Sequence, residues 1–208
     1  MTIQEYLQTA GLVLASGNQQ KLTEFKRILL PRGIELIGAN ELGLDLDVPE
    51  TEPTFRGNAA LKARAYFQHA QRPVIADDSG LVVDALDGAP GVYSARYGGP
   101  GLDDAGRRRF LLSELERVGA TGNNRTARFV CVLALYLPDG DLYYFEGVCE
   151  GSIADTERGS GGFGYDPVFL DPDTGRSFAE LSPQEKDARS HRGRALAALL
   201  DGLSTALP

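Results

Sequence analysis

Short apolar runs alternate with segments of helical periodicity along most of the chain. Residues 12–15 are apolar, and after a polar turn Leu22, Phe25 and Leu29 recur at helical spacing. An apolar run bounded by turn residues is typical of a buried strand, and apolar residues three or four apart are typical of a helix with one buried face. The pattern therefore predicts an α/β fold in which helices flank a central sheet.

The remaining segments extend this pattern and add an antiparallel pair. Residues 127–137 and 141–149 are strand-like and are joined by Pro138-Asp139-Gly140, which predicts a hairpin and hence a mixed sheet. Ser182-Pro183-Gln184-Glu185 is a capping box that predicts a helix start, and we expect a break near Ser190 with a second helix ending around residue 203. Further strands are predicted at residues 34–37, 74–76 and 81–86, and further helices at residues 2–10, 53–70 and about 104–118.

Composition narrows the class of protein. With 208 residues, 42% of them hydrophobic, the chain is long enough for one substantial core, and we expect a single domain over residues 1–208. The net charge of -8 argues against a generic binder of duplex nucleic acid. No apolar run is long enough to cross a bilayer, so a soluble cytoplasmic protein is expected. Cys131 and Cys149 have no metal-ligand spacing and are interpreted as small buried residues.

Asp77 and Asp78 interrupt an apolar run that otherwise reads as a buried strand. Ligands of open α/β sheets bind outside the carboxyl ends of the strands, and we place both aspartates at such an end. A buried carboxylate must be paired, hydrogen-bonded or bound to a metal. The pair therefore indicates a magnesium ligand, a base that activates water, or both. The alternative is a local turn in which Asp78 or Ser79 bonds to nearby backbone.

Two other segments carry polar groups suited to an anionic substrate. Ser16-Gly17-Asn18 leads from a strand into a helix, whose first N–H groups can bind phosphate, and Lys21 adds a charge. An ordinary N-cap role for Asn18 is the alternative. Asn58 and Lys62 are four residues apart and share a helix face, either exposed or lining a cleft with Glu50 at its entrance.

The C-terminal third holds a glycine-rich segment and a cluster of polar residues. Residues 159–167 contain four glycines around Phe163 and Tyr165, which is typical of a loop whose backbone approaches a flat ligand. A helix break near Ser190 would place His191 and Arg192 in a first turn that can bind an anion. The run of arginines at residues 107–109 is interpreted as solvated, because consecutive helical residues point in different directions.

Four segments together resemble the inosine triphosphate pyrophosphatase family, the dITP/XTP or non-canonical purine nucleoside triphosphate pyrophosphatases. They are Leu14-Ala15-Ser16-Gly17-Asn18 with Lys21; Ile75-Ala76-Asp77-Asp78-Ser79-Gly80-Leu81 with residues 88–97; Gly161-Gly162-Phe163-Gly164-Tyr165-Asp166-Pro167; and Lys186 with Ser190-His191-Arg192-Gly193. The likeness spans roughly residues 12–203 in the family's order. Each motif alone is weak, but their joint order is specific.

The resemblance implies an elongated, two-lobed α/β subunit with a substrate cleft between the lobes, and a homodimer. It implies Mg²⁺-dependent hydrolysis of ITP, dITP and XTP to the monophosphate and pyrophosphate, which would cleanse the nucleotide pool. No nucleic acid or membrane partner is expected. The preference among these nucleotides and the dimer contacts do not follow from the sequence.

The resemblance also implies roles for individual residues. Asp78 would be the catalytic base and a metal ligand, with Glu50 as the second acidic ligand. Because neighbours in an extended strand point to opposite faces, Asp77 is assigned a supporting role. Phosphate contacts would come from Ser16, Gly17, Asn18, Lys21, Lys62 and Ser79; base contacts from Phe163, Gly164, Tyr165, Asp166, Lys186, His191 and Arg192; and further support from Asn58 and Arg96.

The chain departs from the family pattern in two places, and two other functions stay open. Glu50-Thr51-Glu52-Pro53 lacks the usual glycine, which leaves open whether Glu50 or Glu52 binds the metal. Residues 1–11 form an N-terminal extension.

Two alternatives to the pyrophosphatase function stay open. They are a related phosphohydrolase that acts on other modified nucleotides and a non-catalytic nucleotide-binding module.

Overall fold

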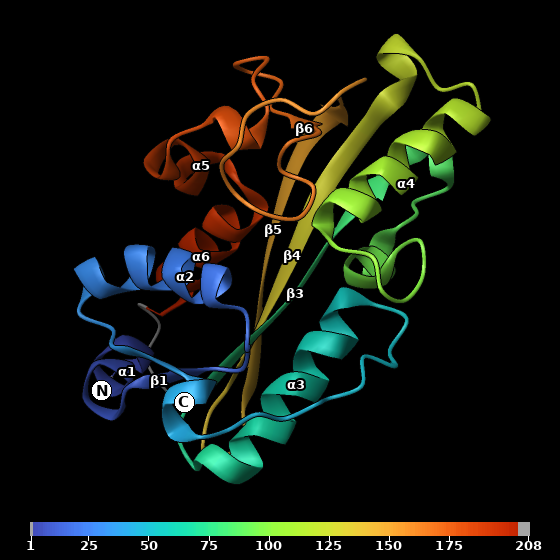
Figure 1. The fold of residues 1–208 in the computed structure, drawn as a ribbon. Helices are drawn as coiled ribbons and strands as arrows, with labels where there is room; N and C mark the ends of the chain where they lie inside the picture. The colour runs from blue at the N-terminus through green and yellow to red at the C-terminus, as the bar shows by residue number, and fades with distance from the viewer. Residues whose placement is uncertain (1, 204–208) are drawn as a thin grey trace. The chain divides into compact units, whose positions relative to one another are not determined.

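A six-stranded mixed sheet runs through the computed structural model, which describes residues 2–203 (Figure 1). Its strand order is β2-β1-β3-β4-β5-β6, with β1 parallel to β2 and β3, and β6 antiparallel to β5. The predicted α/β fold with a mixed sheet is therefore confirmed. The strands are β1 Leu12–Leu14, β2 Leu36–Gly38, β3 Val74–Val83, β4 Thr126–Tyr136, β5 Leu142–Ile153 and β6 Phe169–Leu170.

Six α-helices accompany the sheet within the described part of the chain: α1 Ile3–Ala10, α2 Gln19–Leu29, α3 Phe55–Ala70, α4 Asp104–Arg117, α5 Pro183–Arg189 and α6 His191–Gly202. The predicted break at Ser190 is confirmed, because its extended backbone (φ -68°, ψ 157°) separates α5 from α6. Ser182 caps α5 in the predicted capping box. Pro53, in contrast, lies outside α3, since Thr54 is the N-cap and its side chain accepts a hydrogen bond from the Gly57 N–H.

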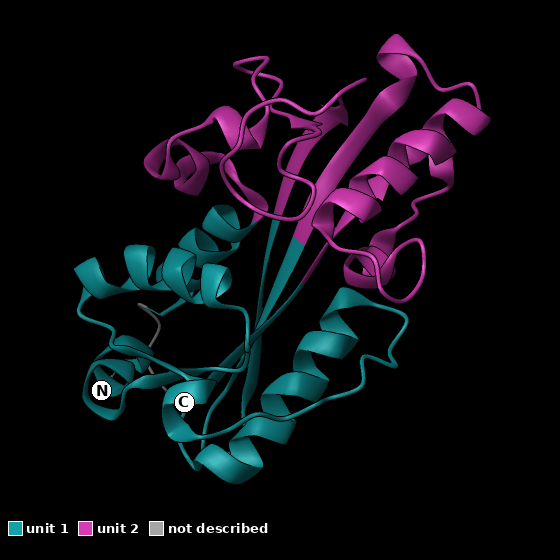
Figure 2. Cartoon of the chain, in the orientation of Figure 1, with its two compact units in different colours: residues 1–78, 131–147, 192–208 teal, residues 79–130, 148–191 magenta. Residues whose placement is uncertain are grey.

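The chain divides into two compact units, each assembled from segments that are distant in sequence (Figure 2). Unit 1 comprises residues 1–78, 131–147 and 192–208, and unit 2 comprises residues 79–130 and 148–191. Strands β3, β4 and β5 contribute residues to both units. The single domain and the cleft between its lobes stay predictions.

Unit 1 has apolar side chains on both faces of β1. Leu12 and Leu14 pack in one cluster with residues of α1, α2 and α6, while Val13 belongs to a second cluster with residues of α3. Figure 1 shows α2 and α6 on one side of the strands of this unit and α3 on the other. Successive strand residues point to opposite faces, and burial of both explains why residues 12–15 are continuously apolar.

Unit 2 has its own core, which joins α4 to the far parts of β3, β4 and β5. Leu111 and Leu115 of α4 pack with residues of these strands. Three aromatic rings add to this core: the Phe129 and Phe169 centroids are 4.5 Å apart, and those of Phe169 and Phe178 are 4.9 Å apart. The three rings belong to the same buried cluster as the α4 residues.

One prediction about the acidic pair was wrong. Asp77 and Asp78 lie in the middle of β3 rather than at its carboxyl end, because the strand continues in extended conformation through Ser79 and Gly80 to Val83. The prediction failed because Ser79 and Gly80 read as turn residues. Both carboxylates are therefore held by a regular strand, and each is almost completely buried.

Candidate active site

Asp78 lies in a group of polar side chains on α3 and the loop before it. Its Oδ1 atom is 2.9 Å from Lys62 Nζ, and its Oδ2 atom accepts a hydrogen bond of 3.3 Å from Asn58 Nδ2. Lys62 Nζ also lies 2.8 Å from Glu50 Oε1. The four-residue spacing of Asn58 and Lys62 directs both toward Asp78, so the interpretation of their shared face as exposed is wrong: Asn58 is fully buried.

Asp77 has different partners, as expected for its neighbour on a strand. Its Oδ2 atom is 2.8 Å from Lys21 Nζ and 3.3 Å from Arg192 Nη2. Arg192 Nη1 in turn lies 2.7 Å from Glu24 Oε2 on α2. This buried chain of opposite charges ties α2 and the start of α6 to β3. Asp77 is thus engaged in holding the helix that carries Lys21.

The two aspartates differ in protonation behaviour. Burial raises the pKa of Asp78 to about 6, with Glu50 and Asp77 adding to the rise and Lys62 opposing it. Burial also acts to raise the pKa of Asp77, but Lys21 and Arg192 outweigh it and hold that pKa well below the usual range. A carboxyl group with a pKa near 6 can take up a proton near neutral pH. Of the two, only Asp78 has this property.

The donor set around Lys62 suits magnesium. Among residues 2–203 no group of three or more His, Cys, Asp or Glu side chains could hold a metal ion. Magnesium, however, keeps several waters and is commonly bound by one or two carboxylates plus substrate phosphates. Glu50 and Asp78 both place an oxygen within 3 Å of the one ammonium nitrogen, so both can reach a single cation.

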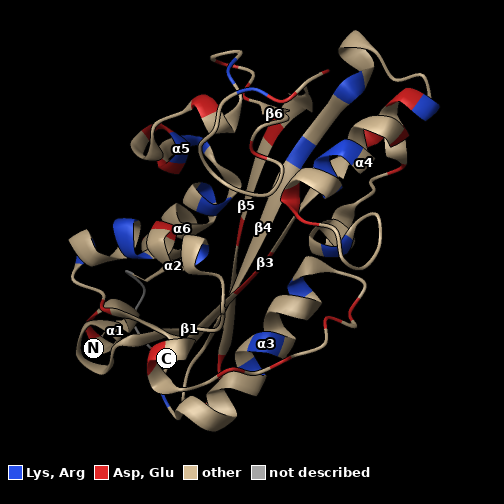
Figure 3. Cartoon of the chain, in the orientation of Figure 1, with Lys and Arg blue, Asp and Glu red and all other residues tan. Residues whose placement is uncertain are grey.

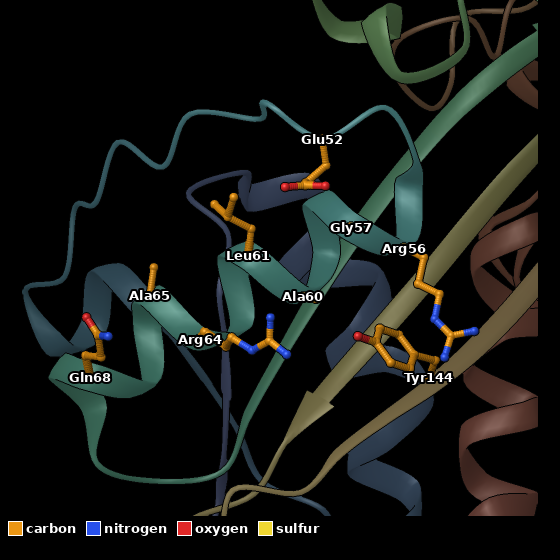
Figure 4. A pocket seen from close by; sticks show the side chains of 9 residues that line it. All are labelled: Glu52, Arg56, Gly57, Ala60, Leu61, Arg64, Ala65, Gln68 and Tyr144. Atoms are coloured by element: carbon orange, nitrogen blue, oxygen red, sulfur yellow. The ribbon is translucent and has the colours of Figure 1, made fainter.

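The Glu52 side chain lines a separate pocket along α3 (Figure 4), although its backbone stays beside the Asp78 group: the Glu52 N–H donates to Asn58 Oδ1 at 2.9 Å, and Asn58 Nδ2 donates to the Glu52 carbonyl oxygen at 3.2 Å. This pocket has a volume of about 450 Å³ and is lined in part by Arg56, Arg64 and Tyr144. The Arg56 guanidinium lies over the Tyr144 ring, 3.9 Å from its centroid. Figure 3 shows acidic positions along the loop before α3 and basic positions within the helix. Of the two glutamates that the sequence left open, Glu50 shares Lys62 with Asp78.

The predicted phosphate turn precedes α2 in unit 1. Asn18 is the N-cap of this helix: its Oδ1 atom accepts hydrogen bonds from the N–H groups of Gln20 and Lys21. The alternative reading of Asn18 is thus correct locally. Ser16, Gly17 and Asn18 also line a cavity of about 290 Å³. Their role in phosphate binding stays a prediction.

The predicted base-binding residues of the glycine-rich segment converge within unit 2. Asp166 Oδ2 accepts a hydrogen bond from the Phe163 N–H (2.8 Å) and lies 2.6 Å from Lys186 Nζ. Lys186 Nζ is 4.8 Å from the centroid of the Phe163 ring. The Tyr165 hydroxyl donates to the Ser94 carbonyl oxygen at 2.9 Å. An aromatic face and a buried ammonium group therefore lie side by side.

The other predicted residues are more dispersed. His191 is buried in unit 2, where its ring stacks on Phe129 with centroids 4.5 Å apart. Arg192 belongs to unit 1, so the structure assigns His191 and Arg192 to different units. Ser79 is half-buried on β3, and Arg96 is exposed beside the Tyr93 ring. The roles assigned to these four residues stay predictions.

Comparisons with known proteins relate this arrangement to a family. The model of the Ham1 family matches residues 12–202. The chain belongs to the Ham1 family. A dITP/XTP pyrophosphatase of Geobacillus kaustophilus is 48% identical over 188 residues, which are 90% of this chain and 91% of that protein.

Solved structures of Ham1 proteins share the fold. The HAM1 protein of Coxiella burnetii matches with a TM-score of 0.84 at 43% identity, covering 93% of this chain and 98% of that one. The Ham1 protein of Staphylococcus aureus matches with a TM-score of 0.79 at 42% identity, covering 92% and 98%. The resemblance inferred from the four motifs is therefore confirmed. Helix α1 precedes the residues that the Ham1 model matches.

Three charged residues near these sites were missed by sequence reasoning. Glu24 is buried against Arg192, although an acidic residue on a helix usually faces solvent. Asp104 and Arg108 of α4 bond to the backbone of Gly164, so the interpretation of the arginines at 107–109 as solvated is wrong for Arg108. The four-residue spacing of Asp104 and Arg108 was the available signal.

Proposed function

We propose that this Ham1-family chain is a nucleoside triphosphate pyrophosphatase that hydrolyses ITP, dITP and XTP to the monophosphate and pyrophosphate. The observation that carries the proposal is the buried Asp78 carboxylate, which shares the Lys62 ammonium group with Glu50 and has a raised pKa. The name of the Geobacillus kaustophilus relative, a dITP/XTP pyrophosphatase, supports the substrate class.

In the proposed reaction Asp78 accepts a proton from the attacking water. A base works best when its pKa lies near the operating pH, and the raised pKa of about 6 meets this condition. Asn58 and Lys62 hold the carboxylate in place. Glu50 and Asp78 would hold Mg²⁺, which supplies positive charge against the phosphate oxygens.

Positive charge for the attacked α-phosphate and the leaving pyrophosphate would come from Lys62 and Lys21. Burial lowers the pKa of Lys62, but the carboxylates of Asp78, Asp77 and Glu50 outweigh it and raise that pKa, so its ammonium group stays charged. A fixed cation at the reacting group stabilises charge that develops in the transition state. Asp77 supports this arrangement through its ion pair with Lys21.

Recognition of the base would fall to the glycine-rich segment. The Phe163 ring offers a stacking face, and Lys186, held by Asp166, offers a donor for an oxo group at position 6 of the purine. A site built to donate to an oxo group rejects adenine, because the 6-amino group would leave the donor unpaired. Removal of such triphosphates would cleanse the nucleotide pool. The resemblance to the family also supports a homodimer.

A substrate profile tests this proposal. Pyrophosphate release would be measured with Mg²⁺ for ITP, dITP and XTP, and for ATP and a pyrimidine triphosphate as controls. We expect rapid release from the first three and little from the controls. Comparable turnover of ATP would refute the assignment, and so would the absence of any pyrophosphate product.

A further inference from the structure

Two side chains of helix α4 form hydrogen bonds to one residue of the glycine-rich segment, Gly164. Asp104 Oδ2 accepts a hydrogen bond of 2.8 Å from the Gly164 N–H, and Arg108 Nη1 donates one of 2.8 Å to the Gly164 carbonyl oxygen. Residues four apart on a helix lie on one face, so the two side chains form a clamp with one arm for each polar group of Gly164. We call this pair the α4 clamp.

The clamped residue lies between two side chains of the proposed base pocket. Gly164 follows Phe163 and precedes Tyr165 in the chain. Its φ of +59° is in the left-handed region, and a Cβ atom there would meet nothing within 4 Å. Glycine is therefore needed for the backbone conformation rather than for space. Fixing both peptide groups of Gly164 also fixes the direction in which the Phe163 ring leaves the backbone.

Other contacts hold the residues on either side of Gly164, and one of them, from the Asp166 N–H to the Phe163 carbonyl oxygen at 3.1 Å, helps to fix the peptide before Gly164. Asp166 holds the Phe163 N–H, and Ser94 holds the Tyr165 hydroxyl group. Neither contact fixes the plane of the peptide between Gly164 and Tyr165, to which the Gly164 carbonyl belongs. Arg108 does so with a charged donor, and hydrogen bonds to charged groups are stronger than neutral ones.

Both arms of the α4 clamp are charged. Burial acts to raise the pKa of Asp104, but hydrogen bonds from Arg107 and from the Gly164 N–H outweigh it and lower that pKa, which keeps the carboxylate ionised. Arg108 is also 3.0 Å from Glu157, whose side chain is more exposed. Solvent weakens this ion pair on the side of Glu157, which is 38% exposed, although the Arg108 side chain is only 13% exposed. The contribution of this pair must therefore be separated by experiment from that of the contact with Gly164.

We propose that Asp104 and Arg108 are positioning residues for base recognition: they hold the Gly164 peptides so that Phe163 presents its ring to the purine. This inference rests on the proposed function for its substrate. In this proposal Asp104 and Arg108 do not touch the nucleotide, and they affect base recognition only through Gly164 and Phe163.

The test compares Arg108→Gln with Arg109→Gln, an exposed neighbour on the same helix, and with Glu157→Gln. Loss of a charged hydrogen bond that holds the pocket should raise KM for XTP about tenfold in Arg108→Gln. We expect kcat to change less than about threefold, since the reacting groups are untouched. Both control variants should keep the wild-type KM.

Asp104 provides an independent arm of the same test. Asp104→Ala should raise KM as Arg108→Gln does, while Asp104→Asn should recover most of the loss because its amide oxygen can still accept the Gly164 N–H. Hydrogen exchange of residues 159–167, measured without substrate, should be faster in Arg108→Gln and Asp104→Ala than in wild type.

Two results would overturn the inference. One is unchanged exchange of residues 159–167 together with an unchanged KM in both variants. The other is an equal rise of KM in Glu157→Gln, which would assign the effect of Arg108 to its ion pair with Glu157. The proposed function fails separately, if wild-type protein releases no pyrophosphate from XTP. Hydrogen exchange still decides whether the clamp holds the loop, because it needs no substrate.

Discussion

Replacing Asp78 with asparagine should stabilise the fold, because it removes a negative charge that is unfavourable in a buried position. The Asp78 side chain is 7% exposed, and burial raises its pKa from 3.8 to about 6. Because the folded state binds this proton more tightly than the unfolded state, the group favours folding below about pH 4. That contribution is lost as the pH rises through 6.

The size of the effect follows from the two pKa values. A difference of about two pKa units corresponds to about 3 kcal/mol of unfolding free energy above pH 6. Asparagine keeps a partner for Asn58 but leaves Lys62 with Glu50 as its acidic neighbour, which offsets part of the gain. We therefore expect Asp78→Asn to be more stable than wild type by about 1–3 kcal/mol at pH 7.5, and by about half as much at pH 5.

Urea unfolding of both proteins in the presence of a metal chelator, from pH 5 to 8, measures this difference. The chelator is needed because bound metal would stabilise the wild-type fold selectively. Asp77→Asn is the matched comparison, and it should destabilise, since the low pKa of Asp77 reflects favourable ion pairs. A less stable Asp78→Asn at pH 7.5, or a difference that does not change with pH, would refute the reasoning.

Three further predictions rest on other contacts described above. Mg²⁺ should raise the melting temperature of wild type and of Glu52→Gln but not of Glu50→Gln, as checked by thermal unfolding; equal responses of the two variants would contradict the assignment of Glu50. Arg192→Met should lower the free energy of unfolding by about 3–5 kcal/mol in urea titrations, because it leaves two buried carboxylates with less compensating charge. Gly162→Ala should raise KM for XTP in steady-state assays, since its Cβ would collide with Asp166, and a wild-type KM would show that the loop adapts.

Much of the architecture could be predicted from local sequence. The strand at residues 12–15 and the capping box at Ser182 combine a periodic pattern with specific end signals, and both were confirmed. The resemblance to the pyrophosphatase family was inferred from motifs that lie in both units, and from the order of these motifs along the chain. The direction of β3 beyond Asp78 could not be predicted, because Ser79 and Gly80 are compatible with a turn and with a strand that other strands flank.

The parts of the site that escaped prediction depend on distant pairing. The partner of Glu24 is Arg192, 168 residues away in sequence, and no local pattern predicts that a helix buries its acidic residue there. Arg108 likewise meets Gly164 across 56 residues. Periodicity gives the face on which such a side chain lies but not what the rest of the fold brings to it. The sequence alone favours exposed side chains for Glu24 and Arg108, but packing against distant segments of the chain buries them at least in part.

The most direct test of the proposed chemistry is the turnover number of Asp78→Asn for pyrophosphate release from XTP with Mg²⁺, measured on protein shown to be folded. An isosteric change that removes the base should lower kcat by about a hundredfold or more. The same variant should be at least as stable as wild type. Near wild-type turnover by folded Asp78→Asn would contradict the assignment of Asp78 as the catalytic base.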